Sequence, residues 1–199
     1  MENSDQTRIT LIERVQDQHD EASWREFEGI YHGFIYGVVR RMNISEHDAE
    51  DIVQQVLITL WKKLPKQDVR TIKRFRSWVS TITKNCVIDF IRKRTSEITR
   101  WEKAARDETA EYLQGIRLPE INALAEKQWQ IHITNRALEN IKPLFFGKAM
   151  EVFQLSLQGR SIGEIAIKLD LKERSVSRLK TRVKNQLTQE IERLREEFE

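Results

Sequence analysis

Apolar residues recur three and four positions apart along most of this chain of 199 residues, which is the spacing of one face of an α-helix. Alternation of apolar and polar residues, the pattern of a half-buried β-strand, is scarce. Only three prolines and seven glycines are available to interrupt the helical pattern. The sequence therefore predicts an all-α protein.

Three long helices are predicted in the first half of the chain. The first carries apolar residues from Trp24 to Met42, and the second is expected from His47 to Leu64, where Pro65 ends it. Ser45 stands in a capping position before the second helix. The third covers Phe75 to Arg94. Three helices of this length suffice for a small bundle of about 70 to 80 residues.

The segment from Thr95 to Gln130 differs from its neighbours, because Arg, Glu and Lys dominate it and apolar residues are sparse. Gly115 and Pro119 interrupt any helix that begins near Thr99. We expect a partly helical linker between two small helical domains. The predicted organisation is an N-terminal extension at 1–22, a three-to-four-helix bundle at 23–95, the linker at 96–130 and a C-terminal domain at 131–199.

A helix-turn-helix pattern occupies Gly159 to Leu187, which reads GRSIGEIAIKLDLKERSVSRLKTRVKNQL. Ser161 and Glu164 have the spacing of a capping box at the start of a short helix. A turn is expected at 170–172. The inner side of the following helix is predicted from four apolar residues, Val176, Leu179, Val183 and Leu187.

The outer face of that second helix carries short hydroxyl side chains and long cations: Arg174, Ser175, Ser177, Arg178, Thr181, Arg182 and Lys184. Arginine can bind guanine through two hydrogen bonds, whereas lysine binds mostly phosphate. This composition suits a recognition helix in the major groove of DNA. An ordinary helical hairpin with a hydrated basic face is the alternative interpretation.

The formal net charge is only +3, although the isoelectric point is near 9.0. Basic residues are clustered: residues 70–94 hold eight of them against one acid, and residues 172–184 hold six against one acid. A single charged run is usually a hydrated helix face. Two runs on two motif-bearing helices favour binding to a polyanion.

Several classes of protein are excluded or disfavoured by what the sequence lacks. Cys86 is the only cysteine, so the chain can form neither an intramolecular disulfide nor a thiolate metal cage, and the four histidines are scattered. There is no glycine-rich phosphate loop and no nucleophile with a base at recognisable spacing. We expect no metal, no cofactor and no enzymatic activity. No apolar run approaches the length of a membrane span, and the polar N-terminus lacks a signal-peptide core, so a cytoplasmic protein is expected.

Four segments, in this order, resemble the sigma-70 family of RNA polymerase sigma factors, specifically the extracytoplasmic-function (ECF) type that has only regions 2 and 4. They are WREFEGIYHGFIYGVVRRM, DAEDIVQQVLITLWKKL, FRSWVSTITKNCVIDFIRKR and GRSIGEIAIKLDLKERSVSRLKTRV. The resemblance covers Ser23 to Arg94 and Arg136 to Leu194. It implies a subunit that binds core RNA polymerase, directs it to promoter DNA and helps to open the duplex.

The resemblance also implies that different helices bind polymerase and the two promoter elements. Contacts with polymerase, through the clamp helices of its largest subunit, are expected from Asp48, Glu50, Asp51, Gln54, Gln55 and Trp61. Recognition and melting of the minus-ten element are expected from Lys73, Arg74, Arg76, Lys84, Asn85, Arg92, Lys93 and Arg94. The residues of the helix-turn-helix named above would read the minus-thirty-five element, and the polymerase flap is a further expected partner of the chain.

The chemistry of the Phe75 to Arg94 helix supports this division independently. Melted DNA offers unstacked bases and phosphates, which polar side chains beside cations can bind. Lys84 and Asn85 are stronger candidates for such contacts than Trp78 and Phe90, because aromatic residues at helical spacing usually belong to a core. We therefore expect Trp78 and Phe90 to be packed.

The chain departs from the family pattern at two places. Gln55 stands where an acid is common. Leu179 with Lys180 stands where Arg and then Leu are more usual, so the promoter sequence that the chain recognises cannot be inferred from other family members. Thr59 lies four residues after Gln55 on the same helix face, and a phosphate on Thr59 would restore negative charge there. A kinase, like an anti-sigma factor, is thus a candidate partner.

A conventional regulator, with a helix-turn-helix that binds DNA and an N-terminal bundle that senses a ligand or dimerises, remains the alternative function. A regulator predicts a ligand pocket and a palindromic DNA site. A sigma factor predicts asymmetric promoter contacts and binding to core polymerase.

Overall fold

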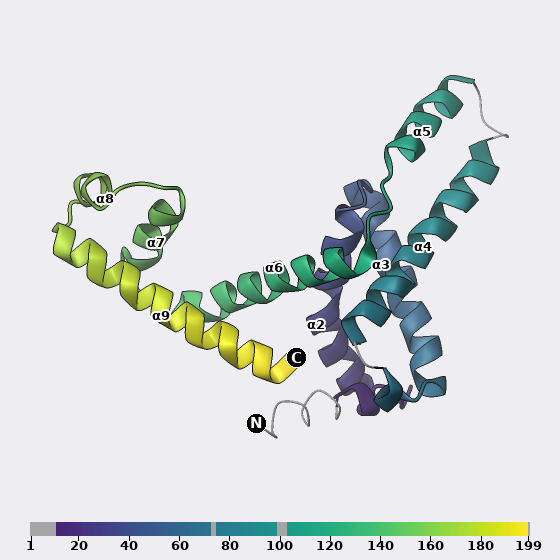
Figure 1. Ribbon diagram of the computed structural model, residues 1–199, viewed down its shortest axis with the longest axis horizontal. Coiled ribbons are helices and arrows are strands. Elements are labelled where there is room, and N and C mark those ends of the chain that lie inside the picture. The colour runs from purple at the N-terminus through teal and green to yellow at the C-terminus, as the bar shows by residue number, and fades with distance from the viewer. Residues whose placement is uncertain (1–10, 73–74, 99–102, 199) are drawn as a thin grey trace. The chain divides into compact units, whose positions relative to one another are not determined.

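The computed structural model describes residues 11–72, 75–98 and 103–198, and these residues form helices and connecting segments without a β-strand (Figure 1). The prediction of an all-α protein is confirmed. The chain divides into two compact units, an N-terminal unit that extends to His132 and a C-terminal unit that begins at Ile133. The boundary falls inside the long helix α6, Ile121–Ile141.

Three helices form the bundle of the N-terminal unit: α2 (Glu21–Arg40), α3 (Glu46–Lys63) and α4 (Phe75–Ile98). Each of the three packs against the other two, as Figure 1 shows for the purple to teal part of the chain. Asp20 caps α2 by accepting a hydrogen bond from the backbone N–H of Ser23. Ser45 caps α3 in the same way through the backbone N–H of Asp48, as the sequence predicts.

Short connections turn the chain between these helices. Asn43 adopts a left-handed conformation, with φ of 62°, in the turn between α2 and α3. Pro65 stands at the start of a 3-10 helix, Leu64–Lys66, which directly follows α3, and a second 3-10 turn spans Val69–Thr71. Residues 11–14 are helical before α2, and Leu11, Ile12 and Val15 are buried.

The core of the bundle is aromatic. Phe27 stacks on Tyr31 with ring centroids 4.5 Å apart, and Phe75 meets both rings edge to face at 6.1 and 5.5 Å. Trp78 tilts against Phe75 at 5.5 Å. Trp78 is only half-buried, however, because it lies at the border of the core rather than inside it.

The predicted linker contains two helices in its described part, α5 (Lys103–Gly115) and the beginning of α6. The interruption between them agrees with the positions of Gly115 and Pro119. Helix α5 lies alongside α4 (Figure 1). Its C-terminal end is held on the α2–α3 turn, because Asn43 donates to the carbonyl of Gly115 at 3.0 Å and Arg117 donates its backbone N–H to Met42 at the same distance.

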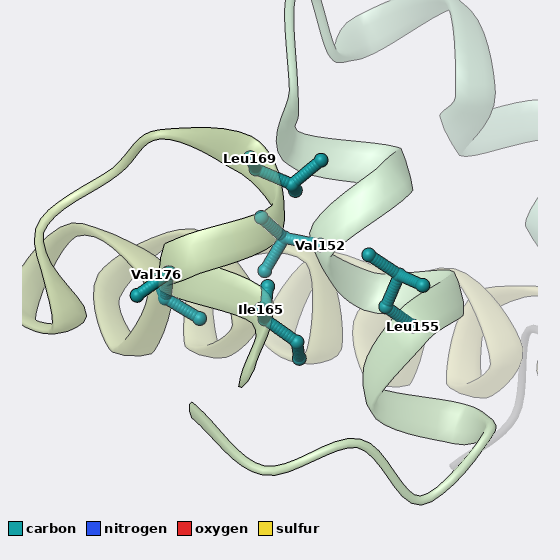
Figure 2. Packing of buried hydrophobic residues seen from close by; sticks show 6 residues of the cluster. Val152, Leu155, Ile165, Leu169 and Val176 are labelled. Atoms are coloured by element: carbon teal, nitrogen blue, oxygen red, sulfur yellow. The ribbon is translucent and has the colours of Figure 1, made fainter. Parts of the chain in front are cut away.

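The C-terminal unit contains the last part of α6, a 3-10 turn (Lys142–Leu144), α7 (Ala149–Leu157), α8 (Ile162–Leu169) and α9 (Glu173–Phe198). Figure 2 shows one apolar cluster where α7, α8 and α9 meet, formed by Val152, Leu155, Ile165, Ala166, Leu169 and Val176. A second cluster joins Ile141, Ala149, Phe153 and Val183. Together they tie α9 to α6, α7 and α8.

The helix-turn-helix forms as the sequence predicts. Ser161 and Glu164 make a complete capping box at the start of α8. Asp170 ends α8 in a left-handed conformation, with φ of 49°. Leu171 then donates its backbone N–H to Ala166 at 2.9 Å and packs on the apolar cluster. Of the predicted inner stripe of α9, Val176 and Val183 are fully buried, and Leu179 and Leu187 partly.

Candidate nucleic-acid interface

Helix α9 presents a basic face opposite its buried valines. The cations and Thr181 are exposed there, namely Arg174, Arg178, Lys180, Thr181, Arg182 and Lys184, while Ser175 and Ser177 are half-buried. The guanidinium of Arg182 lies over the ring of Phe145 at 5.5 Å. Within the described residues, no carboxylate forms an ion pair with Arg174, Arg178 or Lys184. The structure therefore places all the predicted minus-thirty-five residues on one accessible helix.

The cations of α4 have a different environment. Lys73 and Arg74 lie outside the described residues. Asn85 and Lys93 are exposed and Lys84 is half-buried. Arg92 forms an ion pair with Asp89 at 3.4 Å, and Arg94 forms one with Asp48 at 3.2 Å.

The remaining cation of α4, Arg76, is the most enclosed. Its side chain is 17% exposed, its guanidinium lies 5.0 Å above the ring of Trp129, and its Nη2 atom is 3.8 Å from Glu126 of α6. Arg92 and Arg94, near the C-terminal end of α4, are thus paired with acids of the bundle, whereas Arg76 at the N-terminal end is covered by α6.

The outer face of α3 carries the predicted polymerase contacts. Glu50, Asp51, Gln54, Gln55 and Trp61 are exposed, and together they form a polar and acidic strip that ends in an aromatic ring. Two residues of the N-terminal unit contact this strip: the Nε2 atom of His32 lies 3.4 Å from Glu50, and Gln18 donates a hydrogen bond to the backbone carbonyl of Trp61 at 2.9 Å.

Asp48 is placed differently from the other five, because its side chain is 9% exposed. Its carboxylate accepts hydrogen bonds from the hydroxyls of Ser45 at 2.7 Å and Tyr112 at 2.9 Å, and from Arg94 at 3.2 Å. Burial raises the pKa of Asp48, but these hydrogen bonds and the charge of Arg94 outweigh burial, so its pKa lies below the ordinary value. The Tyr112 hydroxyl also accepts the backbone N–H of Ser45 at 3.0 Å. Asp48 therefore connects α3, α4 and α5 inside the unit.

A groove of about 640 Å³ between α3 and α4 brings the two predicted sets together. Asp51 and Gln55 line it from α3, and Asn85, Lys93 and Arg94 line it from α4. Phe90 is half-buried and also lines the groove, so the expectation that it is a packed residue holds only in part.

The same groove contains two residues whose contact the sequence did not reveal. The Thr59 hydroxyl donates to the carbonyl of Gln55 at 2.7 Å, and its oxygen lies 3.9 Å from the sulfur of Cys86. Burial raises the pKa of the Cys86 thiol, which is therefore neutral at physiological pH. No sequence signal links residues 59 and 86, because the contact depends on how α3 and α4 cross.

A second groove, of about 500 Å³, lies between α2 and α3. Trp24, Leu57, Ile58 and Trp61 line it, with polar and charged residues around them. Ile58 is 46% and Trp61 41% exposed. The sequence suggested Trp24 for the core, yet it is half-buried at this groove. The exposed apolar pair three residues apart on α3 is the signal that could have indicated the groove.

The C-terminal unit has its own exposed apolar surface, which sequence reasoning missed. Ile167 is 86%, Leu157 68% and Phe146 90% exposed, and Ile167 lines a groove of about 340 Å³ between α7 and α8 with Leu155 and Ile165. In the part of the chain that the structure describes, three or more His, Cys, Asp or Glu never gather as metal ligands. No described helix is long and apolar enough to cross a membrane.

Comparisons with known proteins agree with this arrangement. The family model for Sigma-70 region 2 matches residues 30–97. The chain is 28% identical to the ECF RNA polymerase sigma factor SigE of Mycolicibacterium smegmatis over 95 residues, which are 47% of this chain and 36% of SigE. It is 32% identical to the ECF RNA polymerase sigma factor SigW of Bacillus subtilis over 75 residues, 38% of this chain and 39% of SigW. These two matches thus span little more than a third of each relative.

The match to the ferric citrate uptake sigma factor FecI of Escherichia coli is more extensive. It is 30% identical over 152 residues and covers 75% of this chain and 80% of FecI. It therefore reaches beyond the matched region 2. With the helical bundle, the helix-turn-helix and these similarities, the chain belongs to the sigma-70 family of RNA polymerase sigma factors and is of the ECF type.

Proposed function

We propose that this chain binds core RNA polymerase and directs it to specific promoters, with separate helices for polymerase and for each promoter element. The observation that carries the proposal is the α3–α4 groove, where Asp51 and Gln55 face the same space as Asn85, Lys93 and Arg94. A polymerase segment docked on α3 would lie beside DNA bound to α4. Bound polymerase would therefore form part of the binding site for DNA, and bound DNA part of the binding site for polymerase.

The minus-thirty-five element is assigned to α9. Its N-terminal half carries Arg174, Ser175, Ser177 and Arg178, which can reach base edges when the helix enters a major groove. Thr181, Arg182 and Lys184, further along the helix, suit contacts with the phosphate backbone. The absence of ion pairs at Arg174, Arg178 and Lys184 within the described residues means that DNA does not have to displace a carboxylate there.

The minus-ten element is assigned to α4 and the segment before it. Lys84, Asn85, Arg92, Lys93 and Arg94 provide amide and cationic groups for a strand held open, and Lys73, Arg74 and Arg76 extend this set towards the N-terminal end of α4. Asn85 is the candidate for base contact, because it is exposed and carries both a donor and an acceptor.

The clamp helices of polymerase are proposed to dock on Glu50, Asp51, Gln54, Gln55 and Trp61. The α2–α3 groove, with Ile58 and Trp61 exposed, supplies the apolar part of this interface. Asp48 serves the interface indirectly, because its carboxylate holds α3 to Arg94 and to α5. The exposed Leu157 and Ile167 are proposed to bind the flap.

Transcription in vitro tests the proposal. Core polymerase with this chain, on fragmented genomic DNA, is expected to give discrete transcripts that core polymerase alone does not give. Asp51→Lys with Trp61→Ala should abolish binding to core polymerase, whereas Arg174→Ala with Arg178→Ala should keep this binding and lose the specific starts. A chain that binds palindromic DNA and never binds core polymerase would contradict the proposal and favour a conventional regulator.

Thr59 is the proposed site for a regulatory kinase. A phosphate on its hydroxyl would place negative charge in the groove beside Gln55, where many family members have an acid, and Lys63 lines the same groove. Thr59→Glu and Gln55→Glu should bind core polymerase more tightly than Thr59→Ala. Equal affinities for the three variants would contradict this part. An anti-sigma factor is proposed to compete for the same α3 surface.

Sigma factors are normally non-enzymatic, and we propose the same for this chain. It would act in the cytoplasm, where core polymerase and promoter DNA are found.

A further inference from the structure

The first half of α6 is docked on α2 at a site lined by glycines. A β-carbon at Gly33 would lie 3.1 Å from Nδ1 of His132, and one at Gly37 would lie 3.0 Å from Oε1 of Gln128. Both distances are shorter than ordinary van der Waals contacts, so a β-carbon would already require the His132 or Gln128 side chain to shift, and a side chain as large as leucine would displace α6. At Gly29, one turn earlier on α2, a β-carbon would meet nothing within 4 Å. The close approach is therefore confined to the docked part of α6.

Trp129 anchors this contact. It is fully buried, stacks on Tyr31 with ring centroids 5.8 Å apart and meets Phe34 edge to face at 5.3 Å. The guanidinium of Arg76 also lies over this ring, 5.0 Å from its centroid. A residue of the linker thus joins the aromatic core to a cation that is proposed for minus-ten DNA.

Acidic residues of the same segment lie near two of the proposed minus-ten cations. Glu126 is 3.8 Å from Arg76. Glu120, directly before α6, has a pKa below its ordinary value, mainly because it accepts the backbone N–H groups of Ala123 and Asn122, and the positive charge of Lys84 adds to this lowering. These carboxylates offer Arg76 and Lys84 the negative charge that phosphates of a bound strand would otherwise supply.

The surface between α6 and α2 also contains a buried side-chain amide, for which a permanent core would be expected to provide a hydrogen-bond partner. Gln128 is 5% exposed, and its Nε2 atom is buried without a hydrogen-bond partner in the part of the chain that is described. Burial of an unpaired amide group opposes docking. Strong aromatic anchoring and an unsatisfied amide together suit a segment that is held firmly but can leave.

We propose that residues 120–132 form an autoinhibitory latch, which covers Arg76 and faces Lys84 in the free protein and must leave α2 before this end of α4 can bind the opened promoter strand. The inference rests on the proposed function, because it assumes that Arg76 and Lys84 contact minus-ten DNA. Residues 120–132 thereby act as a surrogate for the DNA backbone rather than as a passive tether.

A release variant tests the latch in the free chain. The probe is the fluorescently labelled non-template strand of a promoter identified by the transcription experiment above. Gly33→Leu should bind this strand at least about tenfold more tightly than the unmodified chain, which is the gain expected if the latch is closed in about nine of ten molecules or more. Gly29→Leu is the matched control and should bind like the unmodified chain. Glu126→Gln should give a smaller gain, because it removes one partner of Arg76 and leaves Trp129 in place.

A locked variant tests the opposite state in the holoenzyme and keeps the proposal falsifiable if Gly33→Leu folds poorly. Gly33→Cys with His132→Cys, in a chain that also carries Cys86→Ser, should form a disulfide between α2 and α6. The oxidised chain should lose at least about 90% of its promoter-specific transcription while still binding core polymerase, and a reductant should restore it. Transcription that is equal in both redox states would overturn the latch. Failure of the two cysteines to cross-link would also overturn it, because α6 would then not be docked in solution.

These outcomes separate the latch from the proposed function. If the unmodified chain gives no promoter-specific transcripts, the proposed function fails. If it gives them, and the locked chain gives as many, the function stands and residues 120–132 are a permanent fourth helix of the bundle.

Discussion

The two DNA-binding candidates in this chain, α9 of the C-terminal unit and α4 of the N-terminal unit, carry similar densities of basic residues but differ in how these residues are held. Arg174, Arg178 and Lys184 of α9 are exposed and form no ion pair within the described residues. Arg76 and Arg94 of α4 are partnered by acids of α6 and α3. A basic motif can therefore indicate a nucleic-acid surface without indicating whether that surface is open.

This difference has a physical basis in the partners of each helix. Helix α9 packs with one apolar side against α6, α7 and α8, and Figure 2 shows part of this packing. Arg174, Arg178 and Lys184 on its other side are exposed. Helix α4 packs on α2 and α3 and also lies beside α5. Asp48 of α3 and Glu126 of α6 lie within ion-pair distance of Arg94 and Arg76, because long cationic side chains can reach acids on neighbouring helices.

The largest expected effect concerns whether the start of α6 belongs to the core of the bundle. Trp129→Ala should lower the free energy of unfolding of the N-terminal unit by about 3 to 5 kcal/mol, since it removes a fully buried ring. Urea unfolding with hydrogen exchange of the α2 amides would measure it. Trp61→Ala, at an exposed position, should change stability by less than about 1 kcal/mol. Similar losses of unfolding free energy for Trp129→Ala and Trp61→Ala would contradict a core position for Trp129.

The next effect concerns the open surface of α9. Arg178→Ala should reduce discrimination between promoter sequences by about 1 to 3 kcal/mol, because arginine reads a base edge. Lys184→Ala should weaken binding to all sequences alike and lower the salt dependence by about one unit of log–log slope. Fluorescence anisotropy over a range of salt concentrations distinguishes the two. If both variants lose affinity uniformly, α9 binds DNA only through phosphates.

A smaller effect is expected where α5 meets α3. Tyr112→Phe removes the hydroxyl that bridges Asp48 and the backbone N–H of Ser45, and should destabilise the N-terminal unit by about 1.5 kcal/mol. Tyr36→Phe is the control, because its hydroxyl makes no hydrogen bond to a described residue. Hydrogen exchange of the α5 amides should rise only in Tyr112→Phe. Unchanged protection would mean that other contacts hold α5.

Ser161→Ala tests the helix cap at the start of α8 in the C-terminal unit. It removes the side-chain half of the capping box at α8 and should cost about 1 kcal/mol of stability. Binding to DNA should weaken little, because α9 keeps its own apolar contacts. A large loss of DNA affinity at unchanged stability would show that Ser161 contacts DNA instead of only capping the helix.

The smallest effect is a pH dependence in the N-terminal unit. The pKa of Asp48 is lowered in the folded state from an ordinary value of 3.8, so its ionised form stabilises the unit above this pH, and the contribution is lost as pH falls through the lowered pKa. The free energies of unfolding of the unmodified chain and of Asp48→Asn, measured by urea unfolding, should differ by a constant amount well above about pH 3.8 and should approach each other as pH falls below this value, through the lowered pKa. A constant difference between the two at every pH would contradict this role of the carboxylate.

Much of the local structure follows from the sequence because it depends on neighbours along the chain. Ser45 and Ser161 cap helices where the spacing to Asp48 and Glu164 predicts it. Gly115 ends α5, and Val176 and Val183 lie on the buried side of α9. In each case the determining contact lies within one or two helical turns, where composition and periodicity are informative.

The sequence was less informative about the roles of individual polar residues. Asp48 shares a motif with Glu50 and Asp51, yet its side chain lies inside the unit and theirs lie outside. Trp78 and Trp24 both have core-like spacing and are only half-buried. Burial of such residues depends on which helix arrives from a distant part of the chain, and for Asp48 that helix is α5, which is 64 residues away at Tyr112.

By itself, the sequence determined that the chain is all-helical, that a helix-turn-helix lies near its C-terminus and that two helices are basic, because these properties come from periodicity, capping residues and local charge. Only the tertiary structure decided that Arg76 is covered by Trp129 and Glu126, that Asp51 shares a groove with Arg94, and that the charged segment before residue 132 is docked on α2. These features require contacts between residues far apart in the chain. The sequence alone therefore does not distinguish an exposed cation from a covered one.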